Sequence, residues 1–348
     1  RPRGQPAAQT VWRNEEDDED DERRRRQTKR SWKHDEPRVS HGRVADSTIM
    51  SQTPPPQILD GKGLSERIKD EIASEVTEWT GQGHRAPHLA AVLVGEDGAS
   101  KTYVDHKVRS CERVGFKSTM VLRPADISQR ELLDIVHGLN EDPNIDGFIV
   151  QLPLPNHIDA QAITEAIDPT KDVDGFHPVN IGNLALGLPG FVPATPAGII
   201  TLLERFEVPT EGRHAVVIGR SSIVGTPMSL LLSRSGQPGN CTVTLCHSRT
   251  QDLQEHCLQA DILIAAVGRP EMIKADMVKE GAVVVDVGIT RVKDVTAKRG
   301  YRLRGDVAYD EVAPKCSWIT PVPGGVGPMT IVSLLRNTLL AAKAKAEA

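Results

Sequence analysis

The sequence lacks any long hydrophobic run. Its 348 residues contain no apolar stretch close to the roughly 20 residues that a helix needs to cross a bilayer. The beginning also lacks the basic-then-apolar order of a secretory signal. We therefore expect a cytoplasmic protein without a membrane partner. A hydrophobic share of 39% is enough for cores of ordinary size, and the length predicts about two domains.

Cysteine is scarce and scattered. The number is odd, and no C-x-x-C pair occurs among Cys111, Cys241, Cys246, Cys257 and Cys316. This pattern argues against a disulfide framework and against a zinc site, so we expect reduced, mostly buried thiols and no bound metal. The net charge of −5 argues against nucleic acid as the main partner.

Apolar periodicity is absent from residues 1–49. Residues 15–22 are all acidic and residues 23–26 are all arginine, among Pro, Gln, Ser and His. Such a segment cannot bury enough surface to offset its ordering entropy. An acid-rich start also fits an organelle transit peptide poorly. We expect residues 1–50 to form a disordered, dispensable extension, or upstream sequence that the mature protein does not carry, because the first methionine is Met50.

From Ile58 onward, helical and strand patterns alternate, after a short strand near residues 57–59. Helical apolar spacing and strand-length apolar runs predict helices at 64–79, 99–114 and 129–139, and strands at 88–94, 117–122 and 145–150. After a linking helix at 196–206, strands are expected at 215–218, 242–245, 262–266 and 283–287. This order predicts an α/β protein with two doubly wound parallel-sheet domains, the second Rossmann-like. We place them at 51–195 and 196–327, with residues 328–348 packing back on the first domain as a C-terminal helix.

One stretch near the end is unusually rich in glycine and proline. Residues 321–330 read PVPGGVGPMT, with three prolines and three glycines, and a helix is expected at 331–346. Proline fixes φ and glycine opens conformations closed to other residues, so this composition predicts a rigid loop that can approach a ligand closely. The alternative is a tight connection before the last helix.

A glycine turn follows the first strand of the second domain. The strand at 215–218 runs into GRSSIVGTP at 219–227, and an apolar helix follows at 228–232. In this context a helix N-terminus offers free N–H groups and a positive dipole to a phosphate. The match is imperfect, because Ser221 replaces the usual second glycine and Gly225 comes one place late. A purely structural turn is the alternative.

The end of the next strand predicts NADP rather than NAD. Enzymes that prefer NAD usually place an acid there for the ribose hydroxyls, whereas residues 246–249 read CHSR. Arg220, Ser248 and Arg249 could instead gather around a 2′-phosphate, which suits the forked donors of arginine. Alternatively, Arg249 is a solvated helix-start residue. An insertion-like polar turn at 235–240 lengthens the gap to Ser248 and leaves the arrangement open.

Two residues on a predicted helix of the first domain are candidates for catalysis. Tyr103 and Lys107 are spaced i, i+4 on a predicted helix, so they lie on one face and can share a pocket. A packed ring beside a solvated amine is the alternative.

Polar residues also follow the last strand of the first domain. Gln151 should project from the carboxyl end of its strand, where open α/β sheets place ligands. The turn KDVDGF at 171–176 carries two acids, Asp172 and Asp174. An ordinary surface loop is the alternative for this turn.

The combination of motifs resembles a known family. In order, the chain carries SxxYxxxK at 100–107, VQLPLP at 150–155, KDVDGF at 171–176, GRSSIVGTP at 219–227, DVGI at 286–289 and PVPGGVGPMT at 321–330. Together these closely resemble the bifunctional methylenetetrahydrofolate dehydrogenase/cyclohydrolase family, from about residue 58 to 342. The resemblance implies a homodimeric enzyme of one-carbon metabolism. Such an enzyme oxidises 5,10-methylenetetrahydrofolate with NADP and hydrolyses the methenyl product to 10-formyltetrahydrofolate.

The resemblance also implies roles for individual residues. Lys107 would be the main acid/base group of the hydrolysis, Tyr103 would position the folate ring system, Gln151 would orient the lysine and tune its pKa, and Asp174 would hold the pterin. The implied substrate contacts are Tyr103, Val150, Gln151, Leu152, Asp174, Pro323 and Gly324. The implied cofactor contacts are Gly219, Arg220, Ser221, Ser248 and Ile289.

Two other functions are compatible with parts of the sequence. A single-activity dehydrogenase would keep the cofactor site and lose the lysine chemistry, yet Tyr103, Lys107, Gln151 and Asp174 are all present. A non-catalytic binding protein on the same scaffold would tolerate losses at these positions, and none is seen.

Overall fold

The computed structural model describes residues 56–95, 98–297 and 300–347, with the side chains of 98–102 excepted. The expectation for residues 1–50 lies outside this range. No helix within the described ranges is both long and apolar enough to cross a membrane.

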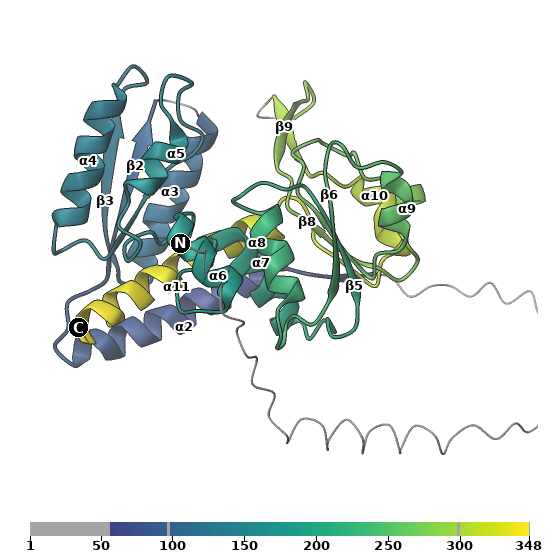
Figure 1. Cartoon of the computed structure of the whole chain (residues 1–348), viewed down its shortest axis with the longest axis horizontal. Coiled ribbons are helices and arrows are strands. Elements are labelled where there is room, and N and C mark those ends of the chain that lie inside the picture. The colour runs from purple at the N-terminus through teal and green to yellow at the C-terminus, as the bar shows by residue number, and fades with distance from the viewer. Residues whose placement is uncertain (1–55, 96–97, 298–299, 348) are drawn as a thin grey trace, which may run out of the picture. The chain divides into compact units, whose positions relative to one another are not determined.

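The first sheet has three parallel strands in the order β3-β2-β4. Its strands are β2 (His88–Val94), β3 (Lys117–Arg123) and β4 (Gly147–Val150). The helices around it are α3 (Gly98–Arg113), α4 (Gln129–Glu141) and α5 (Ala160–Glu165), shown in Figure 1.

The central strand β2 is buried on both faces. Ala90 and Val92 pack in one apolar cluster with Leu132 of α4, whereas Leu89 and Ala91 belong to another cluster that includes α3. Because successive side chains of a strand point to opposite faces, a strand covered on both sides reads as a continuous apolar run. This explains why the strand was predicted at its exact bounds.

The second sheet has six parallel strands in the order β1-β11-β8-β7-β5-β6. These are β1 (Gln57–Ile58), β5 (His214–Ile218), β6 (Thr242–Cys246), β7 (Ile262–Ala265), β8 (Val283–Asp286) and β11 (Trp318–Ile319). The chain builds outward from β5 in both directions, so the topological switch point lies between β5 and β7. The expected strand near 57–59 is present, but it pairs with β11 and extends the second sheet rather than the first.

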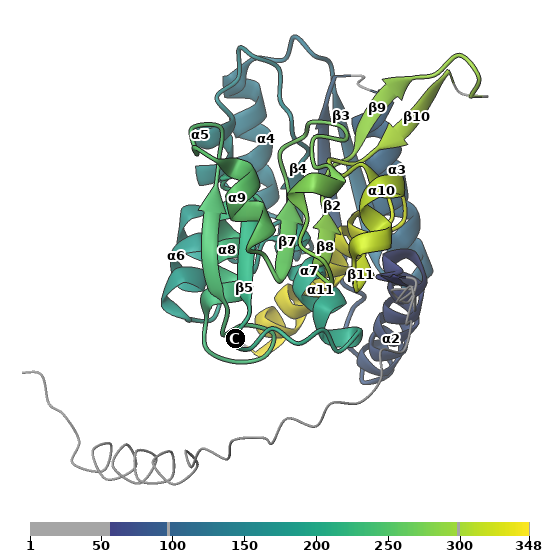
Figure 2. The same ribbon diagram turned by 90° about the vertical axis from the view of Figure 1, so that its right-hand side faces the viewer.

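Helices cover both faces of the second sheet (Figure 1). They are α7 (Ala194–Arg205) and α8 (Gly225–Ser233) on one face, and α9 (Leu253–Leu258) and α10 (Tyr309–Val312) on the other. Shorter elements are α6 (Pro178–Leu186), the 3₁₀ turns η1 (Ala275–Met277) and η2 (Ala313–Lys315), and a hairpin of β9 (Thr290–Lys293) and β10 (Tyr301–Arg304). Figure 2 shows this hairpin projecting away from the second sheet.

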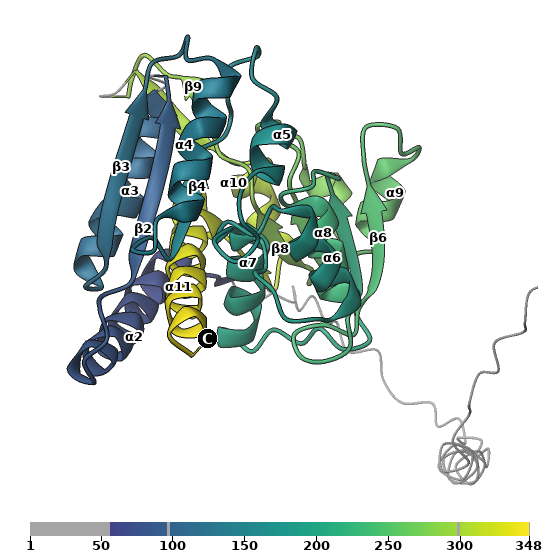
Figure 3. The same cartoon turned by 60° about the vertical axis from the view of Figure 1, so that its left-hand side comes forward.

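Two long helices, α2 (Gly61–Gly81) and α11 (Val326–Glu347), pack against each other. Figure 3 shows α11 between the first sheet and α7, and it contacts both. Arg336 of α11 donates hydrogen bonds to Glu71 and Glu75 of α2. The C-terminal helix therefore packs on the first sheet, as expected.

The helix α11 begins earlier than expected. We predicted a loop through Thr330, but the helix starts at Val326, inside the glycine- and proline-rich stretch. Pro328 is tolerated there because N–H groups of the first helical turn have no intrahelical partner. The predicted fold class, two parallel sheets covered by helices, is confirmed.

Candidate active site

The helix α3 brings Tyr103 and Lys107 together on one face. The Lys107 amine lies 4.8 Å from the centre of the Tyr103 ring. Lys107 is only 4% exposed, which excludes the alternative of a solvated amine. Burial lowers the pKa of this amine, because removal from water disfavours the charged form, and the carboxylate of Asp174 opposes the shift.

Gln151 reaches the lysine from the end of β4. Its backbone N–H donates to Val92 O at 2.9 Å, which continues the pairing of β4 with β2 by one residue. The Lys107 amine donates to Gln151 Oε1 at 3.3 Å, and Gln151 Nε2 donates to Leu152 O at 2.7 Å. The second bond fixes which end of the amide faces the lysine, so Gln151 presents an acceptor to the amine.

The acidic turn at 171–176 is partly built into the fold rather than being an ordinary surface loop. Asp172 is 1% exposed, and Lys171 donates to three backbone carbonyl oxygens at the end of α4. Burial raises the pKa of Asp172 to about 6. His177 N and Asn180 Nδ2 both donate to its Oδ2, at 2.7 and 2.9 Å. These contacts fix the backbone immediately before Asp174.

Asp174 is the charged neighbour of Lys107. Burial raises the pKa of its carboxyl, and the Lys107 amine partly offsets that shift. The next residue, Gly175, has φ +76°, and a Cβ there would lie 2.7 Å from Pro193 N. Asn337 of α11 donates to Val173 O at 2.8 Å and to Val192 O at 3.1 Å. The backbone on either side of Asp174 is thus held in place, before it by Asn337 and after it by the close packing of Gly175 on residues 192–193.

Two further predicted substrate contacts lie close to Asp174. Val150, Leu152 and Asp174 line a small hollow of about 10 Å³. The structure therefore brings Tyr103, Lys107, Gln151, Asp174, Val150 and Leu152 into one region at the carboxyl ends of β2 and β4.

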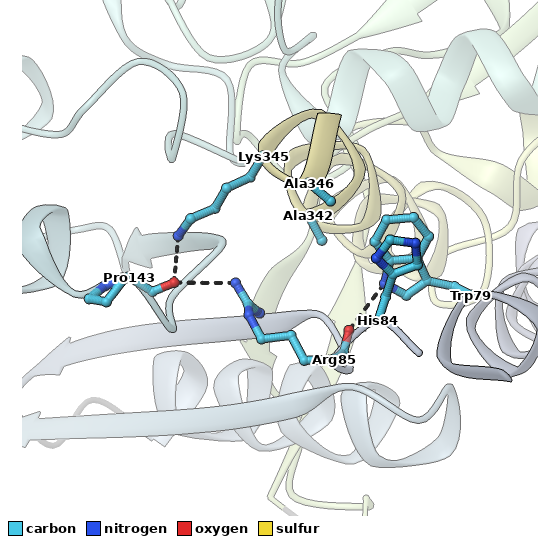
Figure 4. Close-up of a pocket in the computed structure, with 7 residues that line it drawn as sticks. All are labelled: Trp79, His84, Arg85, Pro143, Ala342, Lys345 and Ala346. Carbon is cyan, nitrogen blue, oxygen red and sulfur yellow. Dashed lines mark hydrogen bonds between the residues drawn. The ribbon is translucent and has the colours of Figure 1, made fainter. Parts of the chain in front are cut away.

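A hollow of about 220 Å³ lies elsewhere, where β2 and β4 begin. Figure 4 shows Arg85 and Lys345 donating to the carbonyl oxygen of Pro143, beside the stacked rings of Trp79 and His84. Arg85 also forms a bidentate pair with buried Asp146. Because Arg85 and Lys345 already have hydrogen-bond partners, we interpret this hollow as a packing feature of the fold and not as the active site.

The predicted folate-side residues Pro323 and Gly324 lie in the turn before α11. Gly324 has φ +113°, and its carbonyl accepts from Lys62 N at 2.7 Å, which ties the turn to the start of α2. Burial raises the pKa of the Tyr103 hydroxyl, and the neighbouring Thr330 side chain, from the first turns of α11, opposes that rise. Our sequence-based prediction did not assign a role to Thr330, although the residue lies inside the PVPGGVGPMT motif.

The glycine turn after β5 is closely packed. Gly219 has φ +114°, and a Cβ there would overlap the carbonyl oxygen of Ala266, which follows the neighbouring strand β7. The side chain of Ser221 accepts from Val224 N and Gly225 N, at 3.2 and 3.4 Å. The expectation that the helix start offers free N–H groups is therefore wrong for these two amides, because Ser221 already satisfies them.

The candidates for the 2′-phosphate lie on adjacent turns. Gly219 N donates to Cys246 O at 2.9 Å, so the turn after β6, with exposed Ser248 and Arg249, lies beside exposed Arg220. The insertion-like turn at 235–240 is at the opposite end of these strands, because it precedes β6 and its Gln237 contacts Thr210. It therefore does not disturb the turn that carries Ser248.

Ile289 lies just beyond β8 and is 62% exposed. An exposed large apolar side chain at the carboxyl edge of a parallel sheet fits a ligand-contacting position. Asp286 and Asp306, buried beneath this edge, were not predicted as functional residues. The flanking glycines, Gly288 and Gly305, were the signal that could have identified them.

Comparison with known proteins agrees with this geometry. The model for the tetrahydrofolate dehydrogenase/cyclohydrolase catalytic domain matches residues 59–174, and the model for the NAD(P)-binding domain of the same family matches residues 193–346. The bifunctional protein FolD of Porphyromonas gingivalis is 63% identical over 287 residues, covering 82% of this chain and 97% of the relative.

Solved structures of the family have the same fold. FolD from Campylobacter jejuni is 47% identical, with a TM-score of 0.77, over 83% of this chain and 99% of that one. FolD from Trypanosoma brucei, solved with NADP and an inhibitor, is 37% identical, with a TM-score of 0.80, over 85% of this chain and all of that one. These matches confirm the predicted pair of activities and the predicted nicotinamide dinucleotide domain. The chain therefore belongs to the tetrahydrofolate dehydrogenase/cyclohydrolase family.

Proposed function

We propose that this chain oxidises 5,10-methylenetetrahydrofolate with NADP and hydrolyses the resulting methenyl cation to 10-formyltetrahydrofolate at one site around Lys107. The observation that carries this proposal is a buried lysine amine with a lowered pKa, next to Tyr103, Gln151 and Asp174. A lysine can act as a base near neutral pH only if its pKa is lowered. Burial supplies that shift here.

Lys107 is the proposed acid/base group of the hydrolysis. As a neutral amine it accepts a proton from the water that attacks the methenyl carbon. The ammonium then protonates the ring nitrogen that leaves as the carbon–nitrogen bond breaks, and the hydroxyl proton of the adduct goes to solvent. A cationic substrate also disfavours the ammonium form, which keeps the amine available as a base.

The neighbouring side chains have proposed positioning roles. Gln151 holds the amine through its Oε1 and orients it toward the substrate carbon. Tyr103, which lies next to Lys107 and Thr330, supports the folate ring system. Asp174 binds polar groups of the pterin. Val150, Leu152, Pro323 and Gly324 are the proposed apolar and backbone walls.

Several residues in the loops at the carboxyl edge of the second sheet are suited to bind a dinucleotide. Gly219 gives the close backbone approach, and its turn lies at the topological switch point, where such cofactors bind. The Ser221 hydroxyl accepts two backbone bonds and keeps its own proton for donation to a phosphate. Exposed Ile289 would pack on a ring. When bound, the cofactor accepts the hydride, so the task of the protein in this step is positioning.

NADP rather than NAD is the proposed cofactor. Its support is the lack of an acid at residues 246–249, and the adjacent turns that carry Arg220, Ser248 and Arg249. The structure of the Trypanosoma brucei relative with NADP also favours this choice.

We also propose a homodimer, a cytoplasmic location and the domain boundaries given above, with β1 (residues 57–58) assigned to the domain of the second sheet. The cysteines of the described residues are all free and buried, which fits a reducing compartment.

An assay of both activities in one preparation tests the proposal. NADP reduction with methylenetetrahydrofolate and decay of the methenyl absorbance without dinucleotide should both be observed. Dehydrogenase activity without any enzymatic hydrolysis would instead support a single-activity dehydrogenase. Absence of both activities in folded protein would refute the proposal.

A further inference from the structure

Two buried carboxylates lie beneath the loops at the carboxyl edge of the second sheet. Asp286 is the last residue of β8 and is 3% exposed, and Asp306 follows β10 and is 0% exposed. Burying a carboxylate is costly unless it receives hydrogen bonds. Both side chains accept these bonds from backbone N–H groups of the loops around them.

Asp286 uses both of its oxygens. Its Oδ1 accepts from Gly288 N at 2.9 Å and from Asp306 N at 2.8 Å, and its Oδ2 accepts from Val307 N at 3.0 Å. Its own backbone N–H donates to the hydroxyl of Thr320 at 2.7 Å. Asp286 therefore joins the loop after β8, the loop after β10 and the segment that leads into the glycine- and proline-rich turn.

Asp306 uses only one oxygen. Its Oδ2 accepts from Val267 N at 2.6 Å and from Gly268 N at 3.0 Å, in the loop after β7. Its Oδ1 is the one buried side-chain oxygen or nitrogen of the described residues that lacks a hydrogen-bond partner. A buried oxygen without a hydrogen-bond partner lowers stability, so this arrangement of Asp306 needs an explanation.

Two glycines pack directly against the pair. A Cβ at Gly288 would overlap the carboxyl group of Asp306, and a Cβ at Gly305 would overlap that of Asp286. The Gly305 position also lies against the side chain of Val322, next to Pro323. The two carboxylates are thus in direct contact with the backbone of loops that border the proposed dinucleotide and folate sites.

We infer that Asp286 and Asp306 are a pair of positioning residues for the dehydrogenase step. They hold the loops at 266–268 and 287–289 in the arrangement that receives the dinucleotide. This inference rests on the proposed function, because it presupposes a dinucleotide at this edge. It predicts that the pair affects dinucleotide binding and hydride transfer, but not the hydrolysis at Lys107.

The two asparagine variants should behave differently. In Asp286→Asn, one of two accepting oxygens becomes an NH₂ group that cannot accept, so at least one backbone bond is lost. In Asp306→Asn, the remaining oxygen can keep both bonds while the NH₂ group takes the place of the unpaired Oδ1. We expect Asp286→Asn to weaken NADP binding about tenfold or more, which corresponds to about 1.4 kcal/mol. Asp306→Asn should weaken it less than about threefold.

Titration calorimetry with NADP on the full chain measures this binding directly, and cyclohydrolase activity without dinucleotide is the second measurement. Asp261→Asn is the matched control: this carboxylate also accepts a backbone N–H, that of His214, but at the amino end of the same sheet. The control should bind NADP like the parent. Cyclohydrolase activity should stay within about twofold of the parent in all three variants.

The outcomes separate this inference from the proposed function. A parent that binds no dinucleotide would refute the proposed function itself. A parent that binds NADP, with equal binding by Asp286→Asn, would overturn only the inference. Parallel loss of binding and of cyclohydrolase activity would show a general folding role and would also overturn it. If Asp286→Asn does not fold, Asp306→Ala removes the two bonds to the β7 loop, and unchanged binding by that variant would overturn the inference.

Discussion

The Lys107 amine donates a hydrogen bond to Gln151 Oε1 across 3.3 Å, joining a helix to the end of a strand 44 residues away. Gln151 is neutral, so it orients the amine without adding a negative charge. An acidic side chain at this place would favour the ammonium form and raise the pKa of the amine. The pairing therefore keeps the amine in position while burial lowers its pKa.

Replacement of Lys107 by Met tests the acid/base role. The substitution keeps an unbranched side chain and removes the proton carrier, so cyclohydrolase activity should fall about 100-fold or more, while part of the dehydrogenase activity survives. Lys117→Met, an exposed change on β3, is the control and should leave both rates unchanged. Parallel loss of both activities in Lys107→Met would contradict the assigned role, and an intact hydrolysis rate would remove Lys107 from the mechanism.

A charge at residue 151 should shift the pH dependence of hydrolysis. In Gln151→Glu a carboxylate faces the amine, and an opposite charge at this distance raises the pKa of Lys107. The neutral amine then forms only at higher pH, so the rising limb of the cyclohydrolase pH profile should move upward by about one unit or more. Gln259→Glu adds the same charge at an exposed position directly after α9, beside the second sheet, and should not move the pH profile of hydrolysis. A shift to lower pH would be inconsistent with Lys107 acting as a base.

The fold was predictable where a local pattern follows from burial. The strand β2 was predicted at its exact bounds because both of its faces are covered. The two-residue strands β1 and β11 are too short to show any periodicity, so their pairing could not be read from the sequence. The start of α11 was misplaced because Pro328 was interpreted as a loop residue, although the first helical turn accepts proline.

The candidate site was predictable only in part, because a local sequence pattern does not show tertiary packing. The i, i+4 spacing placed Tyr103 and Lys107 on one face, but a spacing alone does not distinguish a buried amine from a solvated one. That distinction comes from tertiary packing, as does the contact with Gln151. The bonds between Asp286 and the loop after β10 span about 20 residues and depend on how these loops meet, which no local pattern reports.

Cofactor choice gives a prediction about Arg220. If this side chain contacts the 2′-phosphate, Arg220→Ala should raise the KM for NADP about tenfold, because a charged hydrogen bond is lost, and should change the KM for NAD much less. Arg213→Ala removes an exposed arginine at the opposite end of β5 and is the matched control. Equal efficiency of the parent with NADP and NAD would rule out this assignment. Equal increases of both KM values in Arg220→Ala would show that the arginine does not select the phosphate.

The buried carboxyl of Asp172 predicts how stability depends on pH. Burial raises its pKa from 3.8 to about 6, so the folded protein binds this proton more tightly than the unfolded chain does. The resulting stabilisation is fully present below about pH 4 and is lost as the pH rises through about 6. One unit of pKa shift corresponds to about 1.4 kcal/mol, so the effect amounts to a few kcal/mol at most.

The variant Asp172→Asn isolates this effect. Both His177 N and Asn180 Nδ2 donate to the same oxygen of Asp172, so an asparagine can keep these two bonds with its single carbonyl oxygen while it loses the titration. The Tm of the parent minus that of the variant should therefore decrease steadily between pH 4 and pH 7, as measured by thermal unfolding. Asp159→Asn, at the exposed start of α5, is the control, because asparagine caps a helix as well as aspartate does. A Tm difference that stays constant, or that grows with pH, would show that Asp172 does not take up a proton in the folded protein.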